Sequence, residues 1–232
     1  MSRWVAERRF PRYPIQLPVL HDAVSPGSSG KKAGWTRDLS EGGACLELSE
    51  RLPVPSSLSI QLQTDRGAVE VEAQVVWEAA TRESSEGEGG ILHGVAFTHL
   101  SLDQLQILRD LLHSLEIERR AAIRLPVDVP ITCQSTNPSA GPLQGRTGDV
   151  SRGGLLLRLS QALPPGTALE CALDHPRGPV TAKGEIVWAE SPERRTSEEP
   201  IRHGLRFTAL GWSSSLSLAL LMTESARASQ PH

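Results

Sequence analysis

Alternating apolar and polar residues predict β-strands along most of the chain. The alternation is clearest at residues 44–48 and 69–75, where every second side chain is apolar. Since successive side chains of a strand point to opposite faces, this period of two is typical of strands with one buried face. Six short strands in roughly 100 residues predict a small closed barrel or a sandwich. In the first half we expect strands near residues 15–23, 33–39, 43–49, 57–63, 69–79 and 91–98.

Turn residues and prolines separate and limit these strands. Residues 26–30 predict a flexible loop, and residues 65–67 predict a hairpin whose counterpart is residues 174–178. Proline cannot donate a backbone hydrogen bond within a sheet, so we expect the first strand of each half at an edge. This expectation is based on Pro14, Pro18, Pro126 and Pro130.

One amphipathic helix is predicted after the last strand of each half. Residues 101–104 have the form of a capping box, and leucines follow at helical spacing up to Leu115. This pattern predicts a helix that lies on a barrel or between two domains. In the second half, residues 213–224 are the equivalent, although four serines weaken the pattern. Residues 225–232 are predicted to form a disordered tail.

The second half of the chain repeats the first. Equivalent residues are 112 positions apart at the start of each half, 111 in the middle and 110 near the end. The two single-residue slips are deletions that surface loops tolerate. Solenoid repeats run ~20–50 residues, so this longer period indicates two domains of ordinary size. We expect domains at residues 3–115 and 116–224.

Two pairs of repeated side chains have mainly structural interpretations. Trp77 and Trp188 are expected to pack in the two cores, with base stacking as the alternative. His93 and His203 each precede a strand with the pattern Gly-x-x-Phe, and we interpret both as structural residues rather than ligands.

The overall charge argues against a general nucleic-acid binder. The chain has 24 Lys and Arg against 27 Asp and Glu, and only three Phe and one Tyr for base stacking. Positive charge is instead local, because arginines cluster at the start of each half. Such clusters in a nearly neutral protein suit a small anionic ligand. They comprise Arg3, Arg8, Arg9 and Arg12 in the first half, and Arg119, Arg120 and Arg124 in the second.

The remaining composition predicts a cytoplasmic protein without cofactors. Cys45, Cys133 and Cys171 form no Cys-x-x-Cys pair and are interpreted as buried apolar residues in a reducing compartment. The longest apolar run near the end, residues 218–222, is too short to cross a bilayer. The beginning of the chain lacks the apolar segment of a signal peptide. No nucleophile–base–orienter pattern or metal-ligand spacing is present, so we predict neither enzymatic activity nor a metal site.

A pair of motifs occurs twice, in the same order and at nearly the same separation. The first motif is R-x-x-x-R and the second is D-x-S-x-x-G. This combination resembles the PilZ domain, a bacterial receptor module for cyclic di-GMP. In the first half the motif residues are Arg8, Arg12, Asp38, Ser40 and Gly43; in the second they are Arg120, Arg124, Asp149, Ser151 and Gly154.

The resemblance covers nearly the whole chain and implies a fold and a binding site. It implies a mainly β protein with two tandem six-stranded antiparallel β-barrels, each followed by a C-terminal α-helix. The arginine motif would be a flexible segment that folds over the ligand, and the residues of both motifs would bind it. In some family members, an arginine directly before the first motif arginine is associated with binding of the ligand as a stacked dimer. Arg119 has that place in the second half, whereas in the first half Glu7 does and Arg9 lies adjacent.

The chemistry of these side chains suits a cyclic dinucleotide. Guanidinium groups pair bidentately with phosphate, read the acceptor edge of guanine and stack on bases. Aspartate and serine offer acceptors to the N–H donors on the opposite guanine edge. As residues i and i+2 of a strand, they would point to the same face. The glycine permits a tight turn or a close backbone approach. Taken alone, an Asp-x-Ser before glycines is typical of a turn cap.

The predicted function is that of a cyclic di-GMP receptor that acts on an unidentified downstream protein. The second arginine motif follows the predicted helix after four residues, so we expect ligand binding to reorient the two domains. The alternative is a degenerate adaptor that binds proteins while one or both nucleotide sites are silent. A nucleic-acid-binding barrel and an enzyme are less favoured hypotheses. No membrane insertion is expected.

Overall fold

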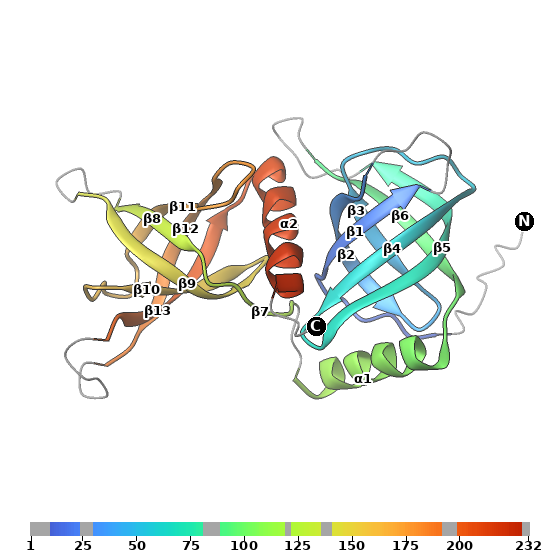
Figure 1. Ribbon diagram of the computed structural model, residues 1–232, viewed down its shortest axis with the longest axis horizontal. Helices are drawn as coiled ribbons and strands as arrows, with labels where there is room; N and C mark the ends of the chain where they lie inside the picture. The colour runs from blue at the N-terminus through green and yellow to red at the C-terminus, as the bar shows by residue number, and fades with distance from the viewer. Residues whose placement is uncertain are drawn as a thin grey trace, which may run out of the picture. The chain divides into compact units, whose positions relative to one another are not determined.

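The computed structural model describes residues 10–23, 30–80, 89–118, 122–135, 141–191 and 199–228 (Figure 1). Its residues divide into two compact units whose common boundary in the sequence lies between residues 121 and 122. We call them unit 1, described from residue 10 to 118, and unit 2, described from residue 122 to 228. Each has its own strands, core and helix.

Unit 1 is a closed barrel of six antiparallel strands. Around the barrel the order is β1-β2-β3-β6-β5-β4, and β4 pairs with β1 to close it. The inward side of β4 shows why the alternating pattern forms this structure, because Leu58, Ile60 and Leu62 are all fully buried. The strands are β1 (Pro18–Ala23), β2 (Lys32–Ser40), β3 (Gly43–Leu48), β4 (Ser56–Thr64), β5 (Gly67–Ala80) and β6 (Ile91–His99).

Unit 2 repeats this barrel and adds one short strand. The ring β10-β13-β12-β11-β8-β9 is closed by the pairing of β9 with β10, and β7 pairs with β9 beside the ring. The predicted fold class, two six-stranded antiparallel barrels, is therefore confirmed. The strands are β7 (Leu125–Pro126), β8 (Pro130–Ser135), β9 (Leu143–Ser151), β10 (Gly154–Leu159), β11 (Ala168–Leu173), β12 (Val180–Ala189) and β13 (Ile201–Ala209).

One helix follows the last strand of each barrel, as expected. Helix α1 (Leu102–Glu118) begins at the predicted capping box. The Ser101 backbone N–H donates to Gln104 Oε1 at 2.7 Å, and the Gln104 N–H donates to Ser101 Oγ at 3.2 Å. Helix α2 (Trp212–Ala228) buries an apolar face that includes Leu218 and Met222. Among the described residues, no helix has the length and apolar character needed to cross a membrane.

Both helices are longer than their apolar stripes. Helix α1 continues to Glu118 rather than ending near Leu115, and α2 continues to Ala228. Residues 225–228 are therefore helical and not part of a disordered tail, while residues 229–232 lie outside the described residues. An apolar stripe marks the buried face of a helix, and a solvated last turn can extend beyond it.

The expectation of an edge strand holds for β7 of unit 2, which contains Pro126 and pairs with β9 alone, and it was wrong for the ring strands that contain Pro18 and Pro130. Strand β1 pairs with both β2 and β4, and β8 pairs with both β9 and β11. Pro18 and Pro130 are the first residues of these strands, a position where a missing N–H donor is tolerated. Closure of the ring removes the edges that Pro18 and Pro130 suggested.

The predicted hairpin is confirmed. Thr64 pairs with Gly67, so Asp65 and Arg66 form a two-residue connection between β4 and β5. Gly67 has a φ of +121°, a conformation that favours glycine, and the Arg66 N–H donates to Thr64 Oγ1 at 3.1 Å. The counterpart in unit 2 also contains a glycine with positive φ, Gly178 at +116°.

The tryptophans do not pack in the cores, contrary to the prediction. Trp77 is 39% exposed and Trp188 is 43% exposed. In both strands the register shifts just before the tryptophan, which breaks the alternation and turns the ring outward. Each indole then lies across a glycine of the neighbouring strand, because a Cβ on Gly94 or Gly204 would meet its Nε1 atom.

The two repeated histidines are structural, as predicted. His93 and His203 are fully buried, and their Nδ1 atoms contact the backbone oxygens of Ile91 and Ile201. Their Nε2 atoms accept hydrogen bonds from backbone N–H groups in the loops after β3 and β10, at 3.1 Å in both units. Each histidine therefore anchors the loop that follows the third strand of its barrel ring, β3 or β10.

Candidate functional site

The D-x-S-x-x-G motif occupies the same structural place in both units. In unit 1 it runs from the end of β2 through a two-residue turn into β3, where Ser40 pairs with Gly43. In unit 2 it joins β9 to β10, and Ser151 pairs with Gly154. The duplicated sequence motif is therefore a duplicated hairpin turn at one end of each barrel.

The segment that carries the second arginine of each R-x-x-x-R motif is held against this hairpin by backbone pairing. In unit 1 the Tyr13 and Leu39 backbones exchange two hydrogen bonds, of 2.9 and 3.0 Å. Buried Thr36 adds a second attachment by accepting from the Leu17 N–H and donating to the Ile15 oxygen. The equivalent residues in unit 2 are Leu125, Val150 and Thr147.

This pairing brings an arginine and an aspartate together in each unit. Arg12 NH1 lies 2.7 Å from Asp38 Oδ1, and Arg124 NH1 lies 3.1 Å from Asp149 Oδ1. All four side chains are about 27–56% exposed, so they can be reached from solvent. The two motifs, 26 and 25 residues apart in the sequence, thus meet as one ion pair per unit.

Serine and glycine of the motif build the turn. Ser40 and Ser151 are buried and donate to the carbonyl oxygens of Gly43 and Gly154, at 3.0 and 3.1 Å. A Cβ on Gly43 would lie 2.1 Å from the Val95 oxygen, and one on Gly154 would lie 2.2 Å from the Leu205 oxygen. The glycines are therefore needed for a close backbone approach, and the serine hydroxyls act as the turn caps that the motif alone suggested.

Four predicted site residues cannot be placed. Arg8, Arg9, Arg119 and Arg120 lie outside the described residues, and their roles stay predictions. The next residue, Phe10, does lie in the described part. Its ring packs over Gly42 in the turn, within 3.0 Å of where a Cβ would be. The arginine segment of unit 1 is thus seated on the hairpin by an aromatic side chain, whereas unit 2 has Ala122 at this position.

The sequence reasoning missed the charged residue at the centre of each turn. Glu41 follows Ser40 in unit 1, and Arg152 follows Ser151 in unit 2. Glu41 is paired with Arg109 of α1 at 2.9 Å. Both turn residues stand at a variable position of the motif, and aligning the two halves would have shown their opposite charges.

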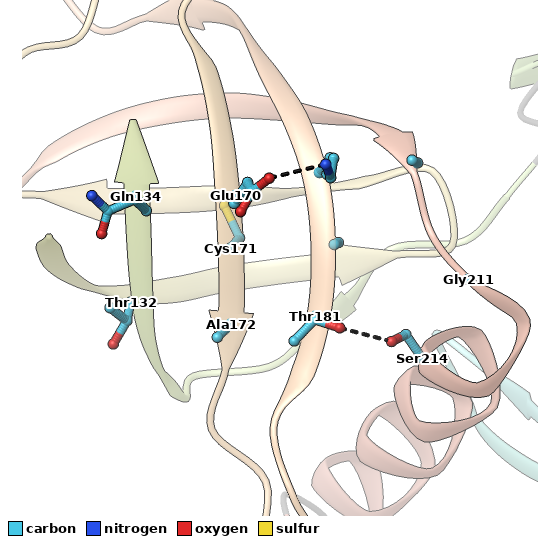
Figure 2. Close-up of a pocket in the computed structure, with 11 residues that line it drawn as sticks. Thr132, Gln134, Glu170, Cys171, Ala172, Thr181, Gly211 and Ser214 are labelled. Carbon is cyan, nitrogen blue, oxygen red and sulfur yellow. Dashed lines mark hydrogen bonds and ion pairs between the residues drawn. The ribbon is translucent and has the colours of Figure 1, made fainter. Parts of the chain in front are cut away.

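A cleft on the outer wall of unit 2 contains no motif residue. It has a volume of about 450 Å³ and is lined by residues of β8, β11, β12 and β13 and by the start of α2 (Figure 2). Lys183 and Glu170 form an ion pair of 3.0 Å across it, and Thr181 and Ser214 are 3.1 Å apart. Four of its polar side chains are therefore engaged in pairs and none of its residues belongs to a motif, so we do not place the candidate site there.

Buried thiols accompany the site but offer no ligand chemistry. Cys45 stands opposite Asp38 in the β2–β3 pairing, and burial raises the pKa of its thiol to about 11. All three cysteines are buried, as predicted. Within the described residues, no group of three or more His, Cys, Asp or Glu side chains is arranged to hold a metal ion.

Known structures include proteins similar to this chain. PlzA of Borreliella burgdorferi, in complex with c-di-GMP, is 12% identical and matches 90% of this chain and 88% of its own, with a TM-score of 0.41. The PilZ domain of YcgR from Escherichia coli, with c-di-GMP, is 19% identical over 49% of this chain and 95% of its own, with a TM-score of 0.41. An inhibitor of motility from Bacillus subtilis, MotI/DgrA, is 9% identical over 94% and 99%, with a TM-score of 0.40. No curated protein matches the chain.

The family comparison agrees with the duplication of fold and motif. A family model of the PilZ domain matches the chain twice, over residues 6–114 and over residues 118–214. The two matches correspond to the two barrels and include every motif residue of both units. The chain therefore belongs to the PilZ domain family, with two copies of the domain in tandem.

Proposed function

We propose that the protein is a receptor for cyclic di-GMP, with one binding site in each unit. The observation that carries the proposal is the arginine–aspartate pair that recurs beside the serine–glycine turn in both barrels. Membership of the PilZ family supports the same ligand, because the two motifs by which the sequence resembles this receptor module are present in both copies.

In this proposal the arginine–aspartate pair is a pre-positioned set of ligand contacts. Ion pairs between partly exposed side chains contribute only ~0–1 kcal/mol, so a ligand can replace the contact without a large penalty. The guanidinium of Arg12 or Arg124 then donates two hydrogen bonds to a phosphate or to a guanine edge. The carboxylate of Asp38 or Asp149 accepts from the N–H groups of the other guanine edge.

The proposed output is a change in how the two units are oriented, passed on by contact with a downstream protein. Helix α1 ends at Glu118 and unit 2 is described from Ala122 onward, so the intervening sequence contains Arg119 and Arg120. If these two arginines bind the ligand, binding constrains the same residues that connect the units. Small-angle scattering of the full chain, with and without cyclic di-GMP, tests this part, and an unchanged profile at saturation removes it.

Calorimetric titration tests the binding itself. Arg12→Ala and Arg124→Ala should each abolish or weaken one site by about 10- to 100-fold, since hydrogen bonds to charged groups contribute ~1.5–3 kcal/mol. GMP, which lacks the second guanine and the cyclic diester, is the ligand control. If neither substitution changes the titration, the site assignment is wrong. If the wild-type chain binds no cyclic di-GMP, the receptor proposal is wrong and the adaptor alternative remains to be tested.

A further inference from the structure

A small cleft in unit 1 lies between the arginine segment, the motif turn and helix α1. Its volume is about 180 Å³, well above the ~10–15 Å³ that one buried water needs. It therefore has room for a polar ligand group. The lining residues are Pro11 and Tyr13 from the arginine segment, Glu41 from the turn, and Arg109, Leu112 and His113 from α1.

The same place in unit 2 has a different chemistry. The repeat offsets place apolar residues at the positions of Pro11, Tyr13, Arg109 and Leu112. All four of these unit 2 residues are nearly or fully buried, so apolar side chains take the places of Tyr13 and Arg109, while Arg152 and Thr223 stand at the positions of Glu41 and His113. The four buried apolar residues are Ile123, Leu125, Ala219 and Met222.

Arg109 pairs with the carboxylate of Glu41 at the cleft of unit 1. Its Nε and NH2 atoms both lie 2.9 Å from Glu41 Oε2, and its side chain is 53% exposed. An exposed pair of this kind contributes little stability. The guanidinium group carries five N–H donors in a planar fork, which matches two oxygens of a phosphate. Arg109 can therefore exchange Glu41 for an anion at small cost.

The position of this pair connects it to the proposed site. Glu41 is three residues after Asp38, in the same hairpin, and Tyr13 follows Arg12 directly. The arginine segment and the motif turn therefore each contribute one residue to the Arg12–Asp38 pair and at least one residue to the cleft. A dianionic ligand bound at Arg12 would bring negative charge towards Glu41, which opposes binding, and towards Arg109, which favours it.

We propose that this cleft is an anion-binding subsite of unit 1, in which Arg109 leaves Glu41 and binds a phosphate oxygen of the cyclic dinucleotide. The inference rests on the proposed function and deepens it. Glu41 competes with the ligand for Arg109, so it lowers the affinity of unit 1. Unit 2 has a cation in the turn itself, Arg152, and Ala219 in place of the helix arginine, so its site works without this exchange.

The test uses the full chain with Arg124→Ala, so that unit 1 dominates the cyclic di-GMP titration. Arg109→Gln should weaken binding about tenfold, because a charge-assisted contact to phosphate is lost. Glu41→Gln should strengthen binding about two- to fivefold, because the competitor of the ligand is neutralised. Both substitutions break the same ion pair. If the pair were only structural, both would change the cyclic di-GMP affinity in the same direction.

A matched control separates ligand binding from attachment of the helix. Arg66 lies on the β4–β5 hairpin and pairs with Asp110 of α1 at 3.4 Å, and neither residue lines the cleft. Arg66→Gln removes a comparable ion pair from the same helix and should leave the affinity unchanged. If Arg109→Gln has no larger effect than Arg66→Gln, or if Glu41→Gln also weakens binding, the subsite does not exist.

A second probe distinguishes failure of the subsite from failure of the ligand assignment. Inorganic pyrophosphate should raise the thermal unfolding midpoint of Glu41→Gln, and not that of Arg109→Gln, at matched ionic strength. This result without any cyclic di-GMP binding would retain the anion site and overturn the proposed ligand. If pyrophosphate raises the unfolding midpoints of both variants by the same amount, or raises neither, the subsite is overturned, whatever the dinucleotide titration shows.

Discussion

Units 1 and 2 share the backbone of the candidate site and differ in the side chains around it. Both bring an arginine and an aspartate together through backbone pairing, and both close the turn with a buried serine and a glycine. At the centre of the turn, however, unit 1 has Glu41 and unit 2 has Arg152. The comparison indicates that the hairpin geometry is common to both units, and we propose that the variable position adjusts ligand affinity.

The barrel interiors differ as well. His21 of unit 1 points inward opposite Ile60, and neither ring nitrogen has a hydrogen-bond partner among the described residues. At the equivalent pair of positions, unit 2 has Cys133 opposite Cys171, with sulfur atoms 3.4 Å apart. A buried imidazole without partners is costly, whereas thiols behave as small apolar groups. His21 therefore lowers the stability of unit 1, and unit 2 has no such residue at this position.

Acid should reveal this difference most strongly. Burial lowers the pKa of His21 to about 4, while an unfolded histidine titrates near 6.5. Between these values the unfolded state binds a proton that the folded state does not. The free energy of unfolding of unit 1 therefore falls as the pH drops from 6.5 towards 4, by about 3 kcal/mol. Burial also lowers the pKa of His93, which acts in the same direction.

Hydrogen exchange measured by mass spectrometry at several pH values would report this loss for each unit separately. His21→Cys, which copies the residue of unit 2, is the control. It should remove most of the contribution of this position to the pH dependence and should raise the stability of unit 1. An unchanged acid sensitivity in His21→Cys would contradict the assignment.

A methyl group on the motif glycine should come next in size. Gly154→Ala places a Cβ 2.2 Å from the Leu205 oxygen and should destabilise unit 2 by ~1–3 kcal/mol. Its neighbour offers a matched control, because a Cβ on Gly153 has no atom within 4 Å. Gly153→Ala should therefore be nearly neutral. The two variants can be compared by urea denaturation, and equal midpoints would show that the strands adjust to the extra atom.

Removal of the turn hydroxyl should have the smallest effect. Ser40→Ala and Ser151→Ala each delete one hydrogen bond inside a buried turn and should cost ~0.5–1.5 kcal/mol. Because both hydroxyls are used within the turn, cyclic di-GMP affinity should change less than in Arg12→Ala or Arg124→Ala. A larger loss of affinity than of stability would instead make the serines ligand contacts, as the sequence suggested.

Much of the fold could be predicted because it follows from local patterns. The alternation at residues 69–75 is strand β5, and the capping box at Ser101 begins α1. The position of Trp77 could not be predicted, because a register shift two residues earlier turns it outward, and the sequence does not show such a shift. Closure of the barrel is likewise a property of the whole sheet, so Pro18 alone suggested an edge.

For the candidate site, the sequence identified the residue types but not all of their roles. The meeting of Arg12 with Asp38 depends on the pairing of Tyr13 with Leu39, which follows from the fold. The proposed role of Arg109 depends on the position of helix α1, because Arg109 lies 68 residues beyond Glu41 in the sequence. Long-range contacts of this kind are the part that a single sequence does not contain.

Equilibrium dialysis with labelled cyclic di-GMP tests the central claim most directly. The comparison is between the wild-type chain and the variant with both Arg12→Ala and Arg124→Ala. We predict that the wild-type protein retains the nucleotide and that the double variant retains almost none. Retention by neither protein, or equal retention by both, would contradict the account of two arginine–aspartate sites.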